Sequence, residues 1–224
     1  GFTYNEAGDV GIDSDGNIWT YNGALPFEVT AGTNPTNNTS FSAVELVLDG
    51  DTSFYVPSNF ETLQQAIDSL SKIKTTSNAV IEIIIESGHK LDSGLDVRYG
   101  DYSQFIISSE DATVYLSSSF VVATTPSYIP GNYSNTIMYT DNCSAPTWDV
   151  LVDAEEKDVA GITYHAATGS IESGKGVNNA NSMGLIVSAA SVVFAHGCQF
   201  KNSGNGNRTT TGSTLTAFEC DLSG

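Results

Sequence analysis

Apolar positions recur with a helical period in one stretch of the chain. The recurrence is at three- and four-residue steps, through Phe60, Leu63, Ile67, Leu70 and Ile73. This spacing predicts one apolar stripe on an amphipathic helix. Ser58 followed by Glu61 has the pattern of a capping box, so we expect the helix to run from Ser58 to Ile73.

The pattern then changes to that of a strand. Residues 79–85, AVIEIII, form a β-branched run that is apolar on nearly both faces, which predicts a buried strand. The chain is turn-rich before the helix, and strands and turns continue after it. The helix therefore needs an apolar surface to cover. The open end of a β-solenoid would supply one, because terminal coils expose their core.

An internal repeat near the end supports stacked coils. Four positions, Val193, Ala195, Cys198 and Phe200, match Leu215, Ala217, Cys220 and Leu222 at a constant offset of 22 residues. A helix-free repeat of 20 to 25 residues fits one coil of a parallel β-helix. By strand parity the repeated residues point inward, which predicts stacked, reduced thiols at Cys198 and Cys220. A disulfide between them is the alternative.

Further strands are expected at 81–85, 105–108 and 113–116, with a weaker one across Leu91, Leu95 and Val97. Residues 117–181 are interrupted by prolines and are less regular. We interpret them as an elaborated coil with long surface loops, which carry binding residues in many folds.

Composition and charge narrow the function classes. The 224 residues include 26 Asp and Glu against 8 Lys and Arg, a formal charge of −18. Such a surface repels phosphates and anionic lipids, so we expect no nucleic-acid or membrane partner. No Cys/His cluster indicates zinc, and we expect no metal and no cofactor. The chain starts without methionine and stops in mid-pattern, so we interpret it as part of a longer protein.

Residues 1–55 predict a separate small β unit. An Asp-Gly-Asn turn inside residues 11–23 is typical of a hairpin. Asp13, Asp15 and Asn17 imitate the start of an EF-hand loop, but Ala24 stands where the final Glu is needed, so the turn is preferred. A unit of this size without cysteines buries too little surface to be stable alone, which indicates self-association or docking onto the coils.

Two phrases of the sequence resemble a known family. Residues 15–35, DGNIWTYNGALPFEVTAGTNP, resemble the segment before the β-helix in many bacteriophage tailspikes and tail fibres. The matching residues are Trp19, Leu25, Pro26, Val29, Ala31, Gly32 and Pro35. Residues 56–73, followed by the apolar strand and residues 86–89, ESGH, are similar to the opening of the β-helix in the same proteins. The resemblance covers roughly Gly16 to Leu116.

The resemblance implies an all-β fold. This would be a right-handed, pectate-lyase-like parallel β-helix at residues 56–224, with an N-terminal capping helix and a β linker or attachment unit at residues 1–55. It also implies a homotrimer in the extracellular phage virion, joined to tail or baseplate proteins through its N-terminal side. The expected function is binding, and in the full-length protein depolymerisation, of a bacterial surface polysaccharide. The alternatives are a non-catalytic structural or receptor-binding fibre and a secreted bacterial β-helix lyase, hydrolase or adhesin.

Candidate site residues are few. Glycan hydrolysis needs two carboxylates. The dense carboxylate group comprises Asp149, Asp153, Glu155, Glu156 and Asp158, and the first four are the candidates. The candidate sugar-stacking residues are Tyr128, Tyr133 and Trp148. No stacked carboxylate pair appears on the coils whose register can be predicted, so the 224 residues alone are expected to be inactive.

Lyase chemistry would need a different base. Tyr164 and His165 are adjacent, but neighbours on a strand face opposite sides. His196 shares the inward parity of Cys198 unless Gly197 kinks the strand, so we expect a packed histidine. No G-x-S-x-G signature of a Ser-His-Asp site is present.

Overall fold

The structure is a computed structural model, and it forms two compact units. One unit comprises residues 1–50 and 68–79, and the other comprises residues 51–67 and 80–224. The residues that the structure describes are 2–4, 10–12, 18–21, 27–29, 41–43, 47–48, 50–75, 79–124, 135–155, 157–204, 206–210 and 212–223.

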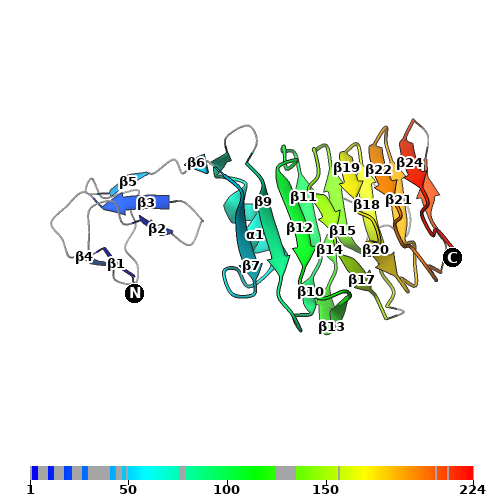
Figure 1. Cartoon of the computed structure of the whole chain (residues 1–224), viewed down its shortest axis with the longest axis horizontal. Coiled ribbons are helices and arrows are strands. Elements are labelled where there is room, and N and C mark those ends of the chain that lie inside the picture. The colour runs from blue at the N-terminus through cyan, green and yellow to red at the C-terminus, as the bar shows by residue number, and fades with distance from the viewer. Residues whose placement is uncertain are drawn as a thin grey trace. The chain divides into compact units, whose positions relative to one another are not determined.

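The first unit is built from short strands (Figure 1). Its strands are β1 (Phe2–Tyr4), β2 (Val10–Ile12), β3 (Ile18–Tyr21), β4 (Phe27–Val29), β5 (Phe41–Ala43), β6 (Val47–Leu48) and β8 (Lys74–Thr75). The β2 and β3 strands pair antiparallel, with Ile12 opposite Ile18, which confirms the expected hairpin. Its Asp-Gly-Asn turn lies outside the described residues.

Three sheets, here called I, II and III, form the second unit. Sheet I contains β7 (Thr52–Val56), β9 (Ile81–Ile85), β12 (Phe105–Ser109), β16 (Thr147–Asp149), β19 (Thr168–Ile171), β22 (Val192–His196) and β24 (Thr214–Phe218). Sheet II contains β10 (Leu91–Ser93), β13 (Val114–Val121), β17 (Leu151–Asp153) and β20 (Gly176–Asn178). Sheet III contains β11 (Leu95–Arg98), β15 (Asn135–Asp141), β18 (Ala160–His165), β21 (Leu185–Ser188) and β23 (Arg208–Thr209), with β14 (Ala123–Thr124) pairing antiparallel to β15.

The chain visits sheets I, II and III in turn, and each return to a sheet adds a parallel strand beside the previous one (Figure 1). Phe105 lies beside Ile81, and Val193 lies beside Leu215, which confirms the 22-residue repeat. The all-β class is therefore confirmed. From β9 onward the described parallel strands follow one another without a helix between them, and each coil buries its apolar face against its neighbours.

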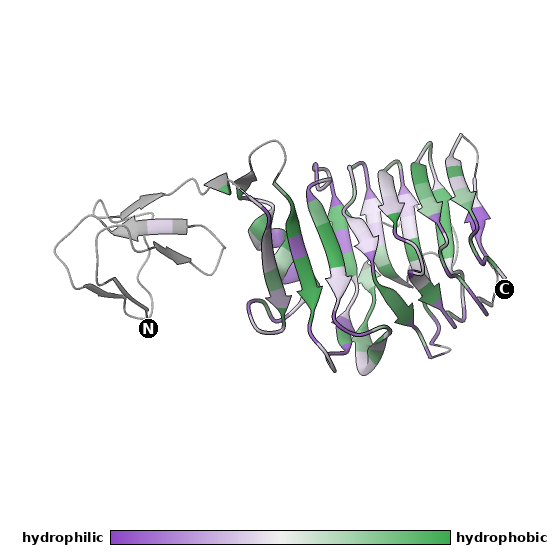
Figure 2. Ribbon diagram, in the orientation of Figure 1, coloured by the Kyte–Doolittle hydropathy of each residue, from purple (hydrophilic) through white to green (hydrophobic). Residues whose placement is uncertain are grey.

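Many strands of the coils carry apolar residues (Figure 2), and the alternating burial along strands such as β9 and β11 places the core inside the coils. On β9, Ile81, Ile83 and Ile85 are buried, whereas Glu82 and Ile84 are half-buried. Ile83 continues through Ile107 and Trp148 as a row of buried side chains across successive strands. Burying each such apolar side chain contributes about 1.5–3 kcal/mol.

The segment at 91–97 forms two strands rather than one. Gly94 separates β10 in sheet II from β11 in sheet III. A Cβ atom at Gly94 would lie 2.4 Å from the backbone nitrogen of Ala123, so a side chain cannot fit at this bend.

The helix α1 spans Leu63–Leu70, so the predicted span from Ser58 to Ile73 is wrong at both ends. The amide of Gln65 donates to Oγ1 of Thr62 at 3.1 Å, and that of Glu61 donates to Oε1 of Gln65 at 2.8 Å. The cap therefore lies four residues later than expected. Ser58 instead donates both its amide and its hydroxyl to Glu86, at 2.7 and 2.8 Å.

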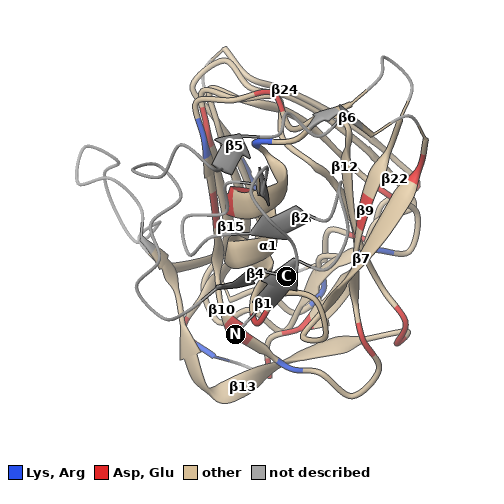
Figure 3. Ribbon diagram, turned by 90° about the vertical axis from the view of Figure 1, so that its left-hand side faces the viewer, with Lys and Arg blue, Asp and Glu red and all other residues tan. Residues whose placement is uncertain are grey.

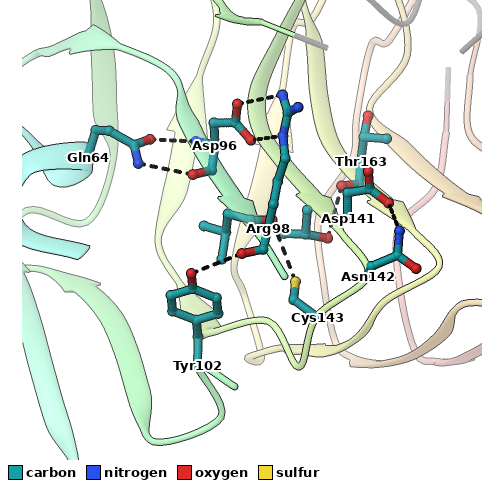
Figure 4. Close-up of polar contacts among 10 residues, drawn as sticks. Gln64, Asp96, Arg98, Tyr102, Asp141, Asn142, Cys143 and Thr163 are labelled. Atoms are coloured by element: carbon teal, nitrogen blue, oxygen red, sulfur yellow. Dashed lines mark hydrogen bonds and ion pairs between the residues drawn. The ribbon is translucent and has the colours of Figure 1, made fainter. Parts of the chain in front are cut away.

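One helix residue bonds to an edge strand (Figure 4). Gln64 Nε2 donates to the carbonyl of Asp96 at 3.0 Å, and Oε1 accepts from the Asp96 amide at 2.7 Å. In sheet III, β11 is the first strand and has β15 on its other side. The side-chain amide therefore pairs with the exposed backbone groups of that edge, as a neighbouring strand would.

Residues 135–181 are more regular than expected. They contribute β15 to β20, which pair in parallel register with their neighbours, so the expected coil is confirmed and is more regular than predicted. Residues 125–134, where a long loop was expected, lie outside the described residues. The stretch hides its pattern because its buried positions include polar and aromatic side chains such as Thr140, Trp148 and Tyr164.

Carboxylates bond the bends of neighbouring coils together. The Ser87 amide donates to Glu110 Oε2 at 2.8 Å, and the Gly88 amide donates to Asp111 Oδ2 at 2.7 Å. The bonds from Gly88 and from the Ser87 hydroxyl lower the pKa of Asp111. Figure 3 shows several Asp and Glu positions on bends of this kind. Part of the acidic composition therefore has a structural use.

The three cysteines are free. Cys198 is fully buried and Cys220 is half-buried, with the Cys198 amide 3.4 Å from Cys220 Sγ. The inward, reduced thiol expected at Cys198 is confirmed. Burial raises the pKa of Cys198 to about 12, with a further contribution from Cys220.

Candidate functional site

Two of the predicted carboxylates, Asp149 and Asp153, lie on strands of different sheets. Asp149 ends β16 in sheet I, and its Oδ1 lies 3.3 Å from Lys175 Nζ. Asp153 ends β17 in sheet II, where its Oδ1 accepts from the amide of Glu155 and from Asn179 Nδ2, both at 2.9 Å. Two members therefore lie on strands rather than in a solvated loop, and each has a partner.

The remaining carboxylate candidates and the sugar-stacking candidates do not come together either, as far as the structure describes them. Glu155 is exposed, and Glu156, Tyr128 and Tyr133 lie outside the described residues. Trp148 is fully buried in the row between Ile107 and Ile171, so its assignment as a sugar-stacking residue is wrong. The physical reason is strand parity, which turns its indole into the core.

His196 faces outward, so the expected packed histidine is also wrong. Gly197 adopts φ +62° and breaks the alternation between His196 and Cys198. The imidazole stacks on the Phe218 ring, with centroids 5.4 Å apart, and its Nε2 lies 3.7 Å from Glu219 Oε2.

Exposed aromatic side chains gather on the outer face of sheet I. Phe194 is 58% exposed and Phe218 is 61% exposed. We call Phe194, His196 and Phe218 the aromatic strip. Phe194 lies beside Ser170 and Thr216 on the neighbouring strands, and His196 lies beside Phe218. The strip thus offers ring faces together with hydroxyl groups.

A second group of residues crosses sheet III at one register position. Arg98, Asp141, His165 and Ser188 occupy the same register position on β11, β15, β18 and β21. We call these four residues the polar row. His165 Nδ1 lies 3.0 Å from Ser188 Oγ. Asp141 is fully buried and its Oδ1 accepts from Asn142 Nδ2 at 2.8 Å.

The Arg98 end of the polar row is fixed by neighbouring side chains (Figure 4). Its guanidinium donates twice to Asp96, at 2.5 Å each, and lies 5.1 Å from the centroid of the Tyr139 ring. Desolvation by burial lowers the pKa of Arg98, but the combined effect of Asp96, Tyr139 and Asp141 is larger, so the pKa lies above its ordinary value. The guanidinium therefore stays charged beside the two carboxylates.

Tyr164 has no place in a surface site. Its side chain is fully buried, its hydroxyl has no hydrogen-bond partner among the described residues, and burial raises its pKa far above the ordinary value. His165 faces outward, so the expectation that these neighbours face opposite sides is confirmed.

Sequence reasoning missed Asp141, Ser188, Phe194 and Phe218. In the polar row, Asp141, His165 and Ser188 follow one another at offsets of 24 and 23 residues. These offsets are close to the 22-residue repeat, so a search for polar residues one coil apart could have found the row.

Comparisons with protein-family models, with curated proteins and with solved structures find no match. Within the described part of the chain, no group of three or more His, Cys, Asp or Glu side chains could hold a metal ion. No helix among those residues is long and apolar enough to cross a membrane.

Proposed function

We propose that the chain is a right-handed parallel β-helix from a bacteriophage tailspike or tail fibre, and that it binds a bacterial surface polysaccharide. The aromatic strip is the observation that carries this proposal. The two phrases of the sequence that resemble tailspikes, and the stacked parallel strands, support the same function. In this proposal α1 caps the first coil, with Gln64 completing the edge of sheet III.

The aromatic strip suits a sugar chain. The exposed rings of Phe194 and Phe218 can stack against the apolar faces of sugar rings, as aromatic side chains do in other recognition sites. Hydroxyl groups of Ser170 and Thr216 lie in register beside Phe194 and can exchange hydrogen bonds with sugar hydroxyls. Neighbouring strands of a parallel sheet lie about 4.8 Å apart, so a linear polymer that crosses the strands of sheet I can contact successive residues of the aromatic strip.

Assembly and location follow from the same proposal. The protein forms a homotrimer in the extracellular virion, and its N-terminal side joins the phage tail or baseplate. A three-fold arrangement closes on itself and leaves no open association surface. Three copies at −18 each repel one another, so association strengthens as salt screens the charge.

Binding can be tested on a panel of purified capsular polysaccharides and lipopolysaccharides by biolayer interferometry. We expect one member of the panel to bind, and Phe194→Ala and Phe218→Ala each to weaken it about tenfold. Tyr115→Ala is the matched control, because this exposed ring lies on sheet II and should leave affinity unchanged. Equal affinity for all variants would reject the aromatic strip as the binding surface.

A further inference from the structure

We propose that Ser188 and His165 form a nucleophile and base pair that hydrolyses a carboxylic ester. Ser188 Oγ and His165 Nδ1 are 3.0 Å apart, within the hydrogen-bond reach that such a pair requires. The two residues come from adjacent strands of sheet III and are in register. That the ester is an O-acyl group on a polysaccharide rests on the function proposed above.

Along the polar row, side-chain exposure decreases from Ser188 and His165 to Asp141. Ser188 and His165 are half-buried and reachable, whereas Asp141 is fully buried beside His165 in the ladder. The bond from Asn142 Nδ2 holds the Asp141 carboxylate in place. Asp141 acts here as a positioning residue, because it flanks His165 in the ladder on the strand opposite to that of Ser188.

Ser188 has two possible hydrogen-bonding arrangements. Its hydroxyl lies 3.2 Å from the carbonyl oxygen of Tyr164, to which it can donate while Nδ1–H of His165 donates to Oγ. In the other tautomer of His165, the hydroxyl donates to Nδ1, and this is the reactive arrangement.

The chemical step balances without a cofactor. Ser188 Oγ attacks the ester carbonyl carbon as His165 Nδ1 takes the hydroxyl proton, and that proton then passes to the departing alcohol. A bond from Oγ to the acyl carbon replaces the ester C–O bond. Water, deprotonated by the same nitrogen, then attacks the acyl group, releases a carboxylic acid and returns the proton to Ser188.

Backbone geometry at Ser188 differs from that at the equivalent bends. Ala189 and Ala190, which follow Ser188, have φ of 56° and 63°, whereas Asn142 and Ala166 are single left-handed residues at the corresponding ends of β15 and β18. Two successive left-handed alanines are costly, and such strain concentrates at functional sites. The turn places Ser188 at the very end of its strand.

The direct test uses p-nitrophenyl acetate as the probe. We expect hydrolysis above the buffer rate, a loss of about 100-fold in kcat for Ser188→Ala, and a similar loss for His165→Asn, which can keep a hydrogen bond but cannot accept the proton. Ser117→Ala is the matched control, because Ser117 Oγ on β13 of sheet II lies 3.3 Å from the hydroxyl of Ser119 rather than from an imidazole. Hydrolysis retained by Ser188→Ala would overturn the proposal.

Two further measurements separate chemistry from folding. A fluorophosphonate should label Ser188 in the unmodified protein, as peptide mass spectrometry would show, and labelling elsewhere would overturn the assignment. Asp141→Asn should lower kcat for p-nitrophenyl acetate by about 100-fold with KM unchanged, as expected for a positioning residue. A change confined to KM or to the melting temperature would remove Asp141 from the mechanism.

The carrier of the ester is tested separately from polysaccharide binding. Acetate release is measured from O-acetylated members of the same polysaccharide panel, with alkali-deacetylated samples as controls. Release that disappears in Ser188→Ala supports the proposal. Hydrolysis of p-nitrophenyl acetate without acetate release from any polysaccharide would keep the pair but reject the polysaccharide as its substrate. Polysaccharide binding without either hydrolysis would reject the pair alone.

Discussion

Gln64 should contribute much more to the free energy of unfolding than its helical neighbour Gln65. In Gln64→Met the helix keeps a side chain of similar size and propensity, but the amide and carbonyl of Asp96 lose their partners at 2.7 and 3.0 Å. Each hydrogen bond contributes about 1 kcal/mol net, so the part-buried pair should contribute about 2 kcal/mol.

Gln65→Met is the matched control. Gln65 is exposed and accepts one bond from the Glu61 amide, so its replacement should cost about 0.5 kcal/mol or less. Both variants are made in a Trp19→Phe background, which leaves Trp148, buried in the second unit, as the fluorescent reporter. Urea unfolding then gives the free energy of unfolding. Losses equal within error for the two variants would refute the edge-pairing argument.

Three other predictions concern the thiols, the bends and the turns. Cys198, whose burial raises its pKa to about 12, should react with iodoacetamide far more slowly than half-buried Cys220, and equal rates in the native protein would contradict this. Because hydrogen bonds lower the pKa of Asp111, its contribution to stability is present at neutral pH and is lost as pH falls below about 4; the melting temperatures of the unmodified protein and Asp111→Asn should converge there. Asn179→Gly keeps the φ of 57° but removes bonds to Asp153 and Asn202, and chemical denaturation should show a loss of about 1–2 kcal/mol.

The elements that sequence alone predicted are those with simple apolar patterns. Burial alternates along the strand at 81–85. Val193 and Leu215, which are 22 residues apart in the sequence, are direct partners on neighbouring strands. Where inward positions carry polar groups, as at Thr140 and Tyr164, apolar and polar residues no longer alternate along the strand, and the strands of the coil could not be recognised from the sequence.

The helix cap was mispredicted because two similar patterns compete. Ser58 and Glu61 have the spacing of a capping box, but Thr62 and Gln65 have it too. In the structure Ser58 bonds to Glu86, one coil later, and this tertiary contact leaves the cap to Thr62.

The candidate site was hidden for a related reason. His196 was assigned to the inner face by parity, but the left-handed Gly197 reversed that assignment. Trp148 was considered a sugar-stacking residue because the register that turns it inward could not be predicted from its surroundings. Phe194 and Phe218 follow the outward parity and become conspicuous once their neighbours are known to be buried.

The composition of the polar row argues that it is more than a stacking device. Stacked coils need hydrogen-bonded partners one coil apart, and like residues suffice for that elsewhere, since Asn179 bonds to Asn202 and Thr147 to Ser170. The polar row instead places a cation, a buried carboxylate, an imidazole and a hydroxyl side by side, in that order. Such an order costs desolvation at the carboxylate, which a ladder of amides or hydroxyls would avoid. The ester hydrolysis that we propose uses the last three members of this order, so the polar row is where we expect selection for function to outweigh selection for stability.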